Sequence, residues 1–217
     1  MTRVGLFMGV FLSGQLLLAE RGLSQADPSI PVTHRVTISS HATVPLNPGG
    51  PRGADEILRK ASELLQIKDG PLDIACNISL VRDGEITSFA TNAPAVIENA
   101  ADRDAIHAEK SFIKVVRQIK FCREGKPKLE GNENYGGCAW NPGRTPSIII
   151  SYPLEFDEVV WAHEFGHTTG LDHRPGPDNL MDPDYALARR QISRCECNSF
   201  HSGPKVLSAT GPWQCTP

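Results

Sequence analysis

The residues of this chain that could carry out chemistry are concentrated in one short segment. His163 and His167 are four positions apart, so on a helix their imidazoles project from one face and can bind a single metal ion. Glu164 lies about 100° away around that helix, off the ligand face but close to the ion. Gly170 permits a positive φ that ends the helix and turns the chain back, which lets His173 supply a third nitrogen. Three protein ligands leave a fourth tetrahedral position for water, as in a catalytic zinc site.

Such a zinc site predicts hydrolytic chemistry. The ion lowers the pKa of its water molecule, so hydroxide becomes accessible near neutral pH. Glu164 is expected to accept the proton of that water as it attacks a peptide carbonyl, and to return it to the leaving nitrogen. The alternative is an ordinary amphipathic helix with solvated histidines. The presence of Gly170 and His173 at fixed offsets argues against that alternative.

The residues that follow add a resemblance to a known family. The motif reads H-E-x-x-H-x-x-G-x-x-H, and Met181 follows His173 by eight residues. Together they resemble the metzincin clan of zinc peptidases, in which the motif precedes a methionine turn. The letters N-L-M ending at Met181, then P-x-Y from Pro183 to Tyr185, look most like the matrixin (matrix metalloproteinase-like) branch. The resemblance implies that Met181 lies beneath the histidines and that Pro183 and Tyr185 wall the pocket for the residue after the scissile bond.

This resemblance is tight from about residue 155 to 187 and loose elsewhere. Upstream, the segments 119–122, 135–143 and 147–151 resemble the strand, edge strand and strand that precede the zinc helix in metzincins. Substrate is then expected to lie extended along the edge strand near residues 136–140. No segment like P-R-C-G-x-P-D, which carries the zinc-capping cysteine of vertebrate matrixins, precedes Cys76. How premature activity is avoided stays open, and we expect no latency controlled by a cysteine, because every cysteine is expected to be in a disulfide.

The first 26 residues have the pattern of a signal peptide. A short basic start is followed by an apolar run from Val4 to Ala19 and by small residues ending at Ala26. The run is too short for a comfortable membrane span, although an uncleaved anchor is the alternative. Cleavage leaves residues 27–217 as a single domain without stable membrane association. We expect a secreted protein, either extracellular or periplasmic.

Cysteine usage and charge narrow the class further. An even count of six cysteines behind a signal peptide predicts three disulfides in an oxidising compartment. The preferred pairing joins Cys122 to Cys138, with Cys195 or Cys197 joined to Cys215. A net charge of −3 without a basic block argues against nucleic acid as a partner. The expected partners are polypeptide substrates, and the expected state is a monomer. Calcium, which matrixins bind, is possible but unsupported, because no acidic segment shows an oxygen-ligand loop pattern.

Periodicity indicates which elements position the motif. It predicts a strand in 34–44, a helix over about 53–67, an alternating strand over 72–80 turning into a partner at 85–89, a short helix within 99–111, a strand over 113–121 and a buried run at 148–150. Asp157 is the expected N-cap of the zinc helix, and a last helix is expected from about Asp184 to Cys195. The predicted fold class is α/β (α+β). It resembles the metzincin plan: a twisted mixed sheet with packed helices above a zinc cleft, and a small C-terminal lobe with the Met-turn.

The sequence thus predicts a secreted zinc endopeptidase. Its pocket is expected to favour apolar side chains after the cleaved bond, with Asp184 pointing away from the cavity. If Arg189 or Arg190 reaches the pocket floor, acidic residues would be preferred instead. Two further alternatives stay open: a zinc-binding but proteolytically silent interaction module, and a disulfide-stabilised structural domain. The intact Glu164 counts against the silent module, because a binding module needs no base there.

Overall fold

The fold is mixed α/β in the computed structural model. The structure describes residues 27, 29–66, 68, 74–90, 92–123, 134–139, 143–184, 190–207 and 215, so the predicted signal peptide lies outside the described residues. The strands are β1 (Val32–Val36), β2 (Ile38–Ser40), β3 (Ile78–Arg82), β4 (Thr87–Ser88), β5 (Val96–Ile97), β6 (Ile113–Val116), β7 (Gln118–Ile119), β8 (Gly137–Cys138) and β9 (Ile148–Ser151). The helices are α1 (Ala54–Gln66), α2 (Ala100–His107), α3 (Asp157–Thr168) and α4 (Arg194–Ser202). In this described part, none of the helices has the length and apolar character needed to cross a membrane.

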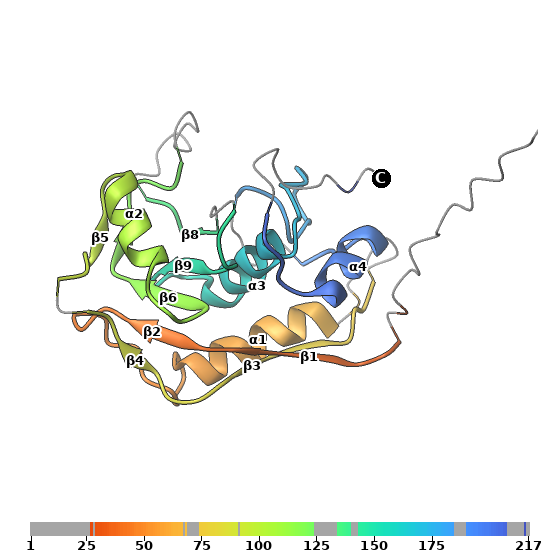
Figure 1. The fold of residues 1–217 in the computed structure, drawn as a ribbon. Coiled ribbons are helices and arrows are strands. Elements are labelled where there is room, and N and C mark those ends of the chain that lie inside the picture. Colours follow the sequence, from red (N-terminus) through yellow and green to blue (C-terminus); the bar gives the residue numbers. More distant parts are fainter. Residues whose placement is uncertain are drawn as a thin grey trace, which may run out of the picture.

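The central sheet is mixed, as predicted, with the strand order β4-β2-β6-β9-β8. Its strands pair in parallel except for β8, which lies at the edge and runs antiparallel to β9. Two smaller parallel pairs, β1–β3 and β5–β7, complete the strands. Only Thr37 separates β1 from β2, so the β1–β3 pair extends the central sheet along the front of Figure 1.

Helices cover both faces of this sheet (Figure 1). α1 and α3 pack together over one face, and α2 lies over the other. Along β9, Ile148 and Ile150 belong to the core beneath α1 and α3, whereas Ile149 belongs to the core beneath α2. All three side chains are fully buried. Burial on both faces explains why this strand is a continuous apolar run rather than an alternating one.

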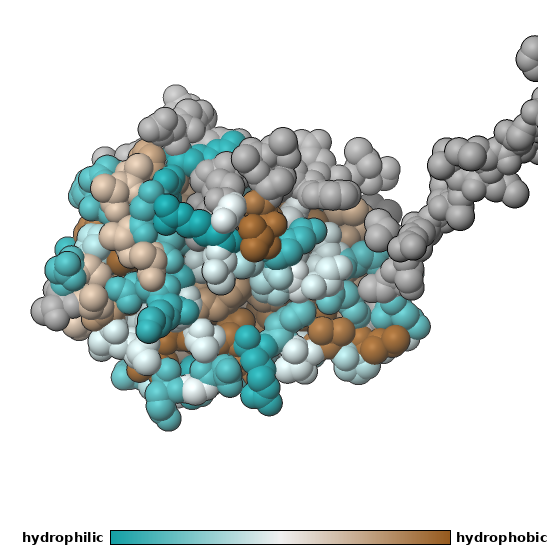
Figure 2. Space-filling model, viewed as in Figure 1, coloured by the Kyte–Doolittle hydropathy of each residue, from teal (hydrophilic) through white to brown (hydrophobic). Residues whose placement is uncertain are grey.

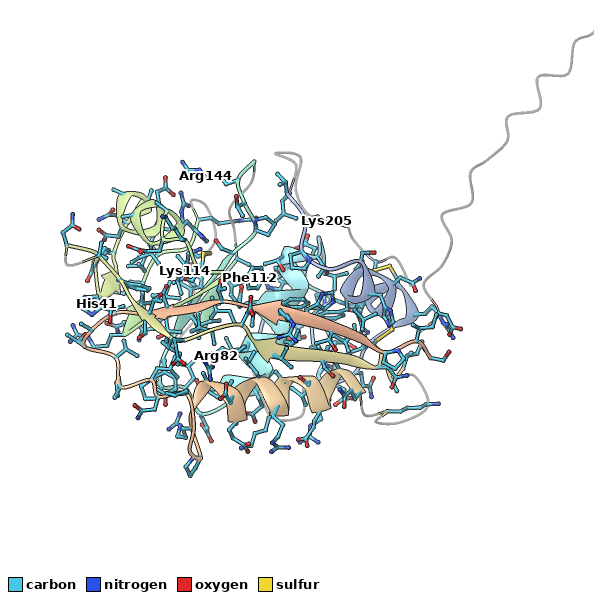
Figure 3. All side chains as sticks on the ribbon, turned by 60° about the horizontal axis from the view of Figure 1, so that its bottom comes forward. His41, Arg82, Phe112, Lys114, Arg144 and Lys205 are labelled. Atoms are coloured by element: carbon cyan, nitrogen blue, oxygen red, sulfur yellow. A yellow bond between two sulfur atoms is a disulfide. The ribbon has the colours of Figure 1, made fainter. Side chains whose placement is uncertain are left out.

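Helix α1 is amphipathic, as its spacing predicts. Its buried face holds Ile57, Leu58, Ala61 and Leu65 and packs against β3 and α3. Its first turn is tied to β3 by an ion pair, in which Arg82 Nε lies 2.8 Å from a carboxylate oxygen of Asp55 (Figure 3). On the face drawn in Figure 2, apolar residues form separate groups between polar ones.

Helix α3 carries the histidine motif through the centre of the molecule, and ten of its twelve residues are buried. The expected N-cap is wrong by one position. Phe156 is the N-cap and makes no side-chain capping bond, whereas Asp157 is the first helical residue. Its carboxylate instead accepts from the Leu154 backbone N–H (3.0 Å) and pairs with Arg52 (2.9 Å), which ties the helix start to the preceding loop. At the other end Gly170 has φ 94°, confirming the predicted turn.

The last helix is not where periodicity places it. Residues 190–193 are not helical, and α4 runs from Arg194 to Ser202; residues 185–189 of the predicted helix lie outside the described residues. Ser193 and Glu196 form a capping box that sets the start of α4. The S-x-x-E signal was therefore present in the sequence, and it outweighs the apolar spacing that suggested an earlier helix.

Two strand predictions also need correction. The predicted partner at 85–89 does not pair with the strand before it, because β4 pairs in parallel with β2. The predicted strand over 72–80 begins only at Ile78, and its first residues, 72 and 73, lie outside the described residues. Before Ile78 the backbone bonds elsewhere: Cys76 N–H donates to the Leu65 carbonyl, and Asn77 has a positive φ.

Three disulfides join all six cysteines of the chain. Cys122 pairs with Cys138, as predicted, and of the two open options for Cys215 the structure has the bond to Cys195. The third bond joins Cys76 to Cys197 and so links α4 to the segment before β3. Such bonds fit the oxidising compartment that the sequence predicts.

Candidate metal centre

The three predicted histidines come together at one point. One ring nitrogen from each of His163, His167 and His173 lies within 4.8 Å of the others. His163 and His167 face the same side of α3, and the turn after Gly170 brings His173 back to them, with its Nε2 3.2 Å from that of His167. The cluster could hold a metal ion.

Hydrogen bonds at the other ring nitrogens orient two of these imidazoles. Nδ1 of His163 lies 2.8 Å from the Leu180 carbonyl oxygen, and Nδ1 of His167 lies 2.8 Å from that of Leu171. A carbonyl only accepts, so the ring protons are on Nδ1 and the Nε2 lone pairs face the cluster centre. This is the outer-shell arrangement that fixes histidine ligands around a metal. The donor set therefore fits a divalent ion that prefers imidazole nitrogen.

Burial favours the neutral form of the His163 and His167 imidazoles. It lowers the pKa of His163 well below the ordinary value of 6.5, and the neighbouring His167 and His173 lower it further. Burial is also the largest cause of the lowered pKa of His167, although Glu164 opposes it. Because a metal binds the deprotonated imidazole, the surroundings already favour the ligand form.

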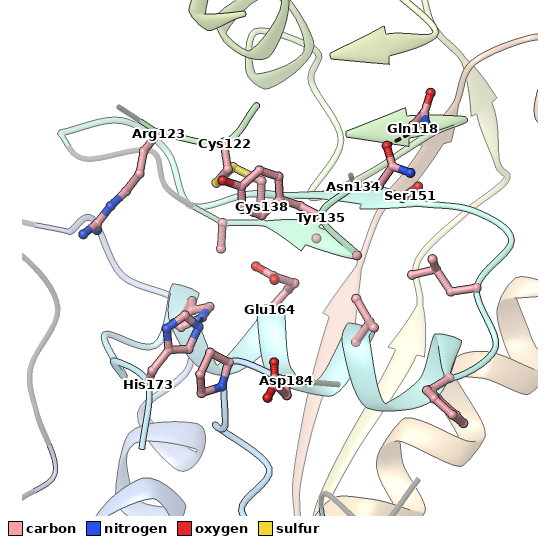
Figure 4. A pocket seen from close by; sticks show the side chains of 18 of the residues that line it. Gln118, Cys122, Arg123, Asn134, Tyr135, Cys138, Ser151, Glu164, His173 and Asp184 are labelled. Atoms are coloured by element: carbon pink, nitrogen blue, oxygen red, sulfur yellow. Dashed lines mark hydrogen bonds between the residues drawn. A yellow bond between two sulfur atoms is a disulfide. The ribbon is translucent and has the colours of Figure 1, made fainter. Parts of the chain in front are cut away.

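Glu164 is separated from the ligand face but shares the cleft with it. Figure 4 shows its side chain directed from α3 toward β8, with His173 beside it. The residue is only 2 % exposed, yet it lines the cleft with His167 and His173. A carboxylate in this position can exchange a proton with a group bound in the cleft.

Met181 packs against the motif helix at Gly166. It is fully buried, and a Cβ added to Gly166 would lie 2.6 Å from its sulfur. Only glycine at position 166 lets the methionine approach α3 so closely. The residue before it, Leu180, supplies the carbonyl that orients His163, so this loop serves as the floor of the site.

A polar network that the sequence does not predict holds this loop. Both oxygens of the Glu196 carboxylate, on α4, accept from the Arg174 guanidinium at 2.7 and 2.8 Å. Arg174 also donates to the carbonyl of Gln191, and its own backbone N–H donates to the Met181 carbonyl. Glu196 is 1 % exposed, so the pair is buried on its acidic side. The two residues are 22 positions apart, and no local pattern links them.

The site opens into a cleft of about 1170 Å³, larger than a typical small-molecule pocket. One wall is the edge strand β8 with Tyr135 and Gly136, and the opposite wall is α3 (Figure 4). Beyond Glu164 the lining is mostly apolar: it includes Pro153, Leu154, Phe156 and Val160, with the carboxylate of Glu155 among them. The cleft therefore offers a sheet edge for backbone hydrogen bonds next to an apolar recess.

Of the two residues expected to wall the substrate pocket, only Pro183 is among the described residues. Pro183 lines the cleft, whereas Tyr185 and Arg189 lie outside the described residues. Asp184, expected to point away, also lines the cleft and is labelled below Glu164 in Figure 4, so that expectation is wrong. Arg190 does not line the cleft. The chain turns at Asp182, whose carboxylate accepts from the Asp184 backbone N–H, and Asp184 is exposed at the rim of the cleft.

The other histidines and acidic groups have structural partners. His34, His107 and His201 lie within hydrogen-bond distance of Phe200 O, Ser147 Oγ and Cys76 O. Asp102, in one of the acidic segments, accepts from the Glu98 backbone N–H at the start of α2. Within the described ranges, the three motif histidines are the one group with suitable spacing for a metal.

Comparisons with known proteins add no relative. The chain matches no protein-family model and no curated protein at a significant level. The resemblance to metzincins therefore stays an expectation drawn from the motif.

Proposed function

We propose that the chain is a zinc-dependent endopeptidase of metzincin type. The observation that carries the proposal is the convergence of His163, His167 and His173 beside Glu164 in an open cleft, where burial lowers the pKa of His163 and His167. Three imidazoles with an open position are the ligand set of catalytic rather than structural zinc. The silent interaction module is less well supported, because it gives no reason for a buried carboxylate, that of Glu164, beside the three histidines.

The proposed mechanism gives the metal ligands and Glu164 different roles. Bound zinc would act as a Lewis acid and make a water molecule acidic enough to react near neutral pH. Glu164 would take the proton of the attacking water and deliver it to the leaving amine nitrogen. The carbonyls of Leu180 and Leu171 hold two of the imidazoles in place throughout.

Substrate recognition follows from the walls of the cleft. An extended polypeptide would add a strand to β8, which lies at the sheet edge facing α3. The side chain next to the scissile bond would enter the recess that includes Leu154, Phe156 and Val160. Secretion is part of the proposal, and the three disulfides support it.

A peptide-library digest with the zinc-loaded protein tests the proposal. Cleavage should stop on chelation and return with zinc. Glu164→Ala should bind one zinc per chain yet lose at least about 100-fold in turnover, the usual contribution of a general base. Glu63→Ala, which removes a surface carboxylate on α1, should cleave at the wild-type rate. If the zinc-loaded wild-type protein cleaves no library peptide, the interaction module becomes the better reading.

A further inference from the structure

The edge strand approaches the proposed base so closely that it has no room for a side chain. A Cβ added to Gly137, the first residue of β8, would lie 2.6 Å from both Cδ and Oε1 of Glu164, with Cγ closer still. Ordinary contacts of a Cβ atom are 3.4–4 Å. The Glu164 side chain therefore occupies the space that any other residue at position 137 would need.

The strand cannot easily give way. Gly137 pairs with Ile150 and Cys138 with Ile149 in the antiparallel ladder. Just before β8, the Ser151 N–H donates to the Gly136 carbonyl (2.9 Å) and the Tyr135 N–H donates to the Ile119 carbonyl (2.7 Å). The disulfide from Cys138 to Cys122 anchors β8 a second time. Moving the strand outward would break several of these bonds together.

The helix backbone is equally constrained. α3 is buried along almost its whole length, between the core residues of β9 and those of α4. The part that can move is the Glu164 side chain, which would rotate away from β8. Because the residue is 2 % exposed, the rotation would carry the carboxylate to a different place in the cleft.

We propose that Gly137 is a positioning residue: its missing side chain reserves the space in which the Glu164 carboxylate is held for proton transfer. The catalytic consequence of this proposal rests on the proposed function. The close approach of Gly137 to the Glu164 side chain does not depend on it. A displacement of about 1 Å in a reacting group costs roughly 100-fold in rate, so even a methyl group should be felt.

Gly166 provides the contrast. A Cβ there would press on Met181, below the histidines, rather than on the base. Gly166→Ala should therefore lower zinc affinity, whereas Gly137→Ala should leave zinc content unchanged. Gly49 is the matched control for space, because a Cβ there meets nothing within 4 Å and no unusual φ is involved.

The first experiment measures kinetics and zinc content. Gly137→Ala should retain one zinc per chain and a near wild-type KM, while kcat falls roughly 100-fold. Gly49→Ala should behave as wild type. An unchanged kcat in Gly137→Ala overturns the proposal, and so does a loss of kcat that comes only with loss of zinc.

The second experiment needs no activity. Gly137→Ala should lower Tm by at least about 2 °C in the wild-type background, through overpacking. It should not lower Tm in the Glu164→Ala background, where the obstructing side chain is gone. Equal losses in both backgrounds, or failure to fold in both, overturn the proposal; folding only in the Glu164→Ala background supports it. If the wild-type protein proves inactive, the proposed function fails. The comparison of Gly137→Ala in the two backgrounds still tests whether Gly137 leaves room for the Glu164 side chain.

Discussion

At the scale of single residues, one helical turn carries two separate tasks. His163 and Glu164 are neighbours in sequence, yet they project about 100° apart, so ligand and base can be changed independently. His173 differs from the other two ligands because it is held by a turn and not by α3. Its position depends on the αL conformation of Gly170, which a residue with a Cβ adopts only at a cost.

This arrangement predicts the effect of removing the third ligand. His173→Ala should fold but should lose zinc at concentrations that saturate the wild-type protein, because two imidazoles remain where three held the ion. Elemental analysis after dialysis measures the zinc content. His41→Ala, which changes a histidine hydrogen-bonded to Thr43 outside the cleft, should keep one zinc per chain. Unaltered zinc affinity in His173→Ala would contradict the three-ligand site.

The sequence predicts residues of this kind when they are close together along the chain. His163, Glu164, His167 and His173 fall at fixed offsets on a helix and its terminal turn, and the structure brings the three histidines together. Gly137 gives no such signal, because its partner Glu164 is 27 residues away and the contact exists only once β8 joins the sheet. Arg174 and Glu196 are likewise paired by folding and not by spacing.

At the scale of elements, the loop after His173 acts as a rigid support. Arg174 holds it to α4 through the buried carboxylate of Glu196, and Leu180 in the same loop orients His163. The network therefore connects the position of α4 to that of a metal ligand. Gln191, which lies inside the helix expected over 184–195, instead offers its carbonyl to the Arg174 guanidinium and to the Leu180 backbone N–H.

Breaking the network should weaken both the fold and the site. Arg174→Met leaves the Glu196 charge buried without its guanidinium partner, which should cost about 3–5 kcal/mol in the free energy of unfolding. Urea denaturation of the zinc-free protein measures it. The double variant Arg174→Met/Glu196→Gln should recover most of the loss, because no buried charge remains and the glutamine can still accept from the Ser193 backbone N–H in the capping box. If the single and the double variant are equally unstable, the loop is held by its packing and not by the pair of Arg174 and Glu196.

The recess beside the base predicts a preference in substrates. Leu154, Phe156 and Val160 should favour Leu, Ile, Met or Phe just after the cleaved bond, since burying such a side chain is worth about 1.5–3 kcal/mol. A library digest of the wild-type protein and of Val160→Ala measures it, and the variant should accept larger side chains. A dominance of Lys or Arg at that position would instead show that an acidic lining residue, Glu155 or Asp184, reads the substrate. A dominance of Asp or Glu would contradict the apolar recess.

The sequence predicts elements whose pattern is local. It does not predict elements whose position depends on pairing between distant segments. α1 and the run at 148–150 follow from periodicity, because one face of the helix and both faces of β9 are buried. The pairing of β4 with β2 has no such basis, since the turn at Gly84 suggested a hairpin and the strand crossed to another neighbour. The start of α3 was misplaced because Asp157 forms its bonds to Leu154 and Arg52 outside the helix.

At the scale of the whole molecule, the disulfides bear on how the proposed activity would be controlled. All six cysteines are paired, so no thiolate is left to cap a metal. Protein beginning near Asp27 should therefore cleave peptides without a lag and without activation by mercurials. Thiol titration of the denatured, unreduced protein should find close to zero thiols per chain. One reactive thiol, together with activation on its modification, would contradict this.

Stability should depend on pH through a lysine in the interior of the fold. Lys114 on β6 is 1 % exposed, and burial lowers its pKa from 10.5 to about 8. The folded protein thus releases this proton near pH 8, whereas the unfolded chain keeps it to pH 10.5. Between these values the unfolded state binds the extra proton, so stability should rise with pH, by up to about 3 kcal/mol.

Lys114→Met isolates this effect in a pH range in which the metal site does not interfere. Below pH 6.5 the ligand histidines and His107, whose pKa burial lowers to about 3, also change stability, so the alkaline range is the cleaner test. The variant should be more stable than wild type at pH 7 and should lack the rise between pH 8 and 10.5, because methionine fills similar space without a charge. Urea denaturation of zinc-free protein across pH 7–10.5 measures both. A rise that persists in Lys114→Met would assign the alkaline dependence to another group, and an unchanged stability at pH 7 would show that the buried ammonium carries no cost.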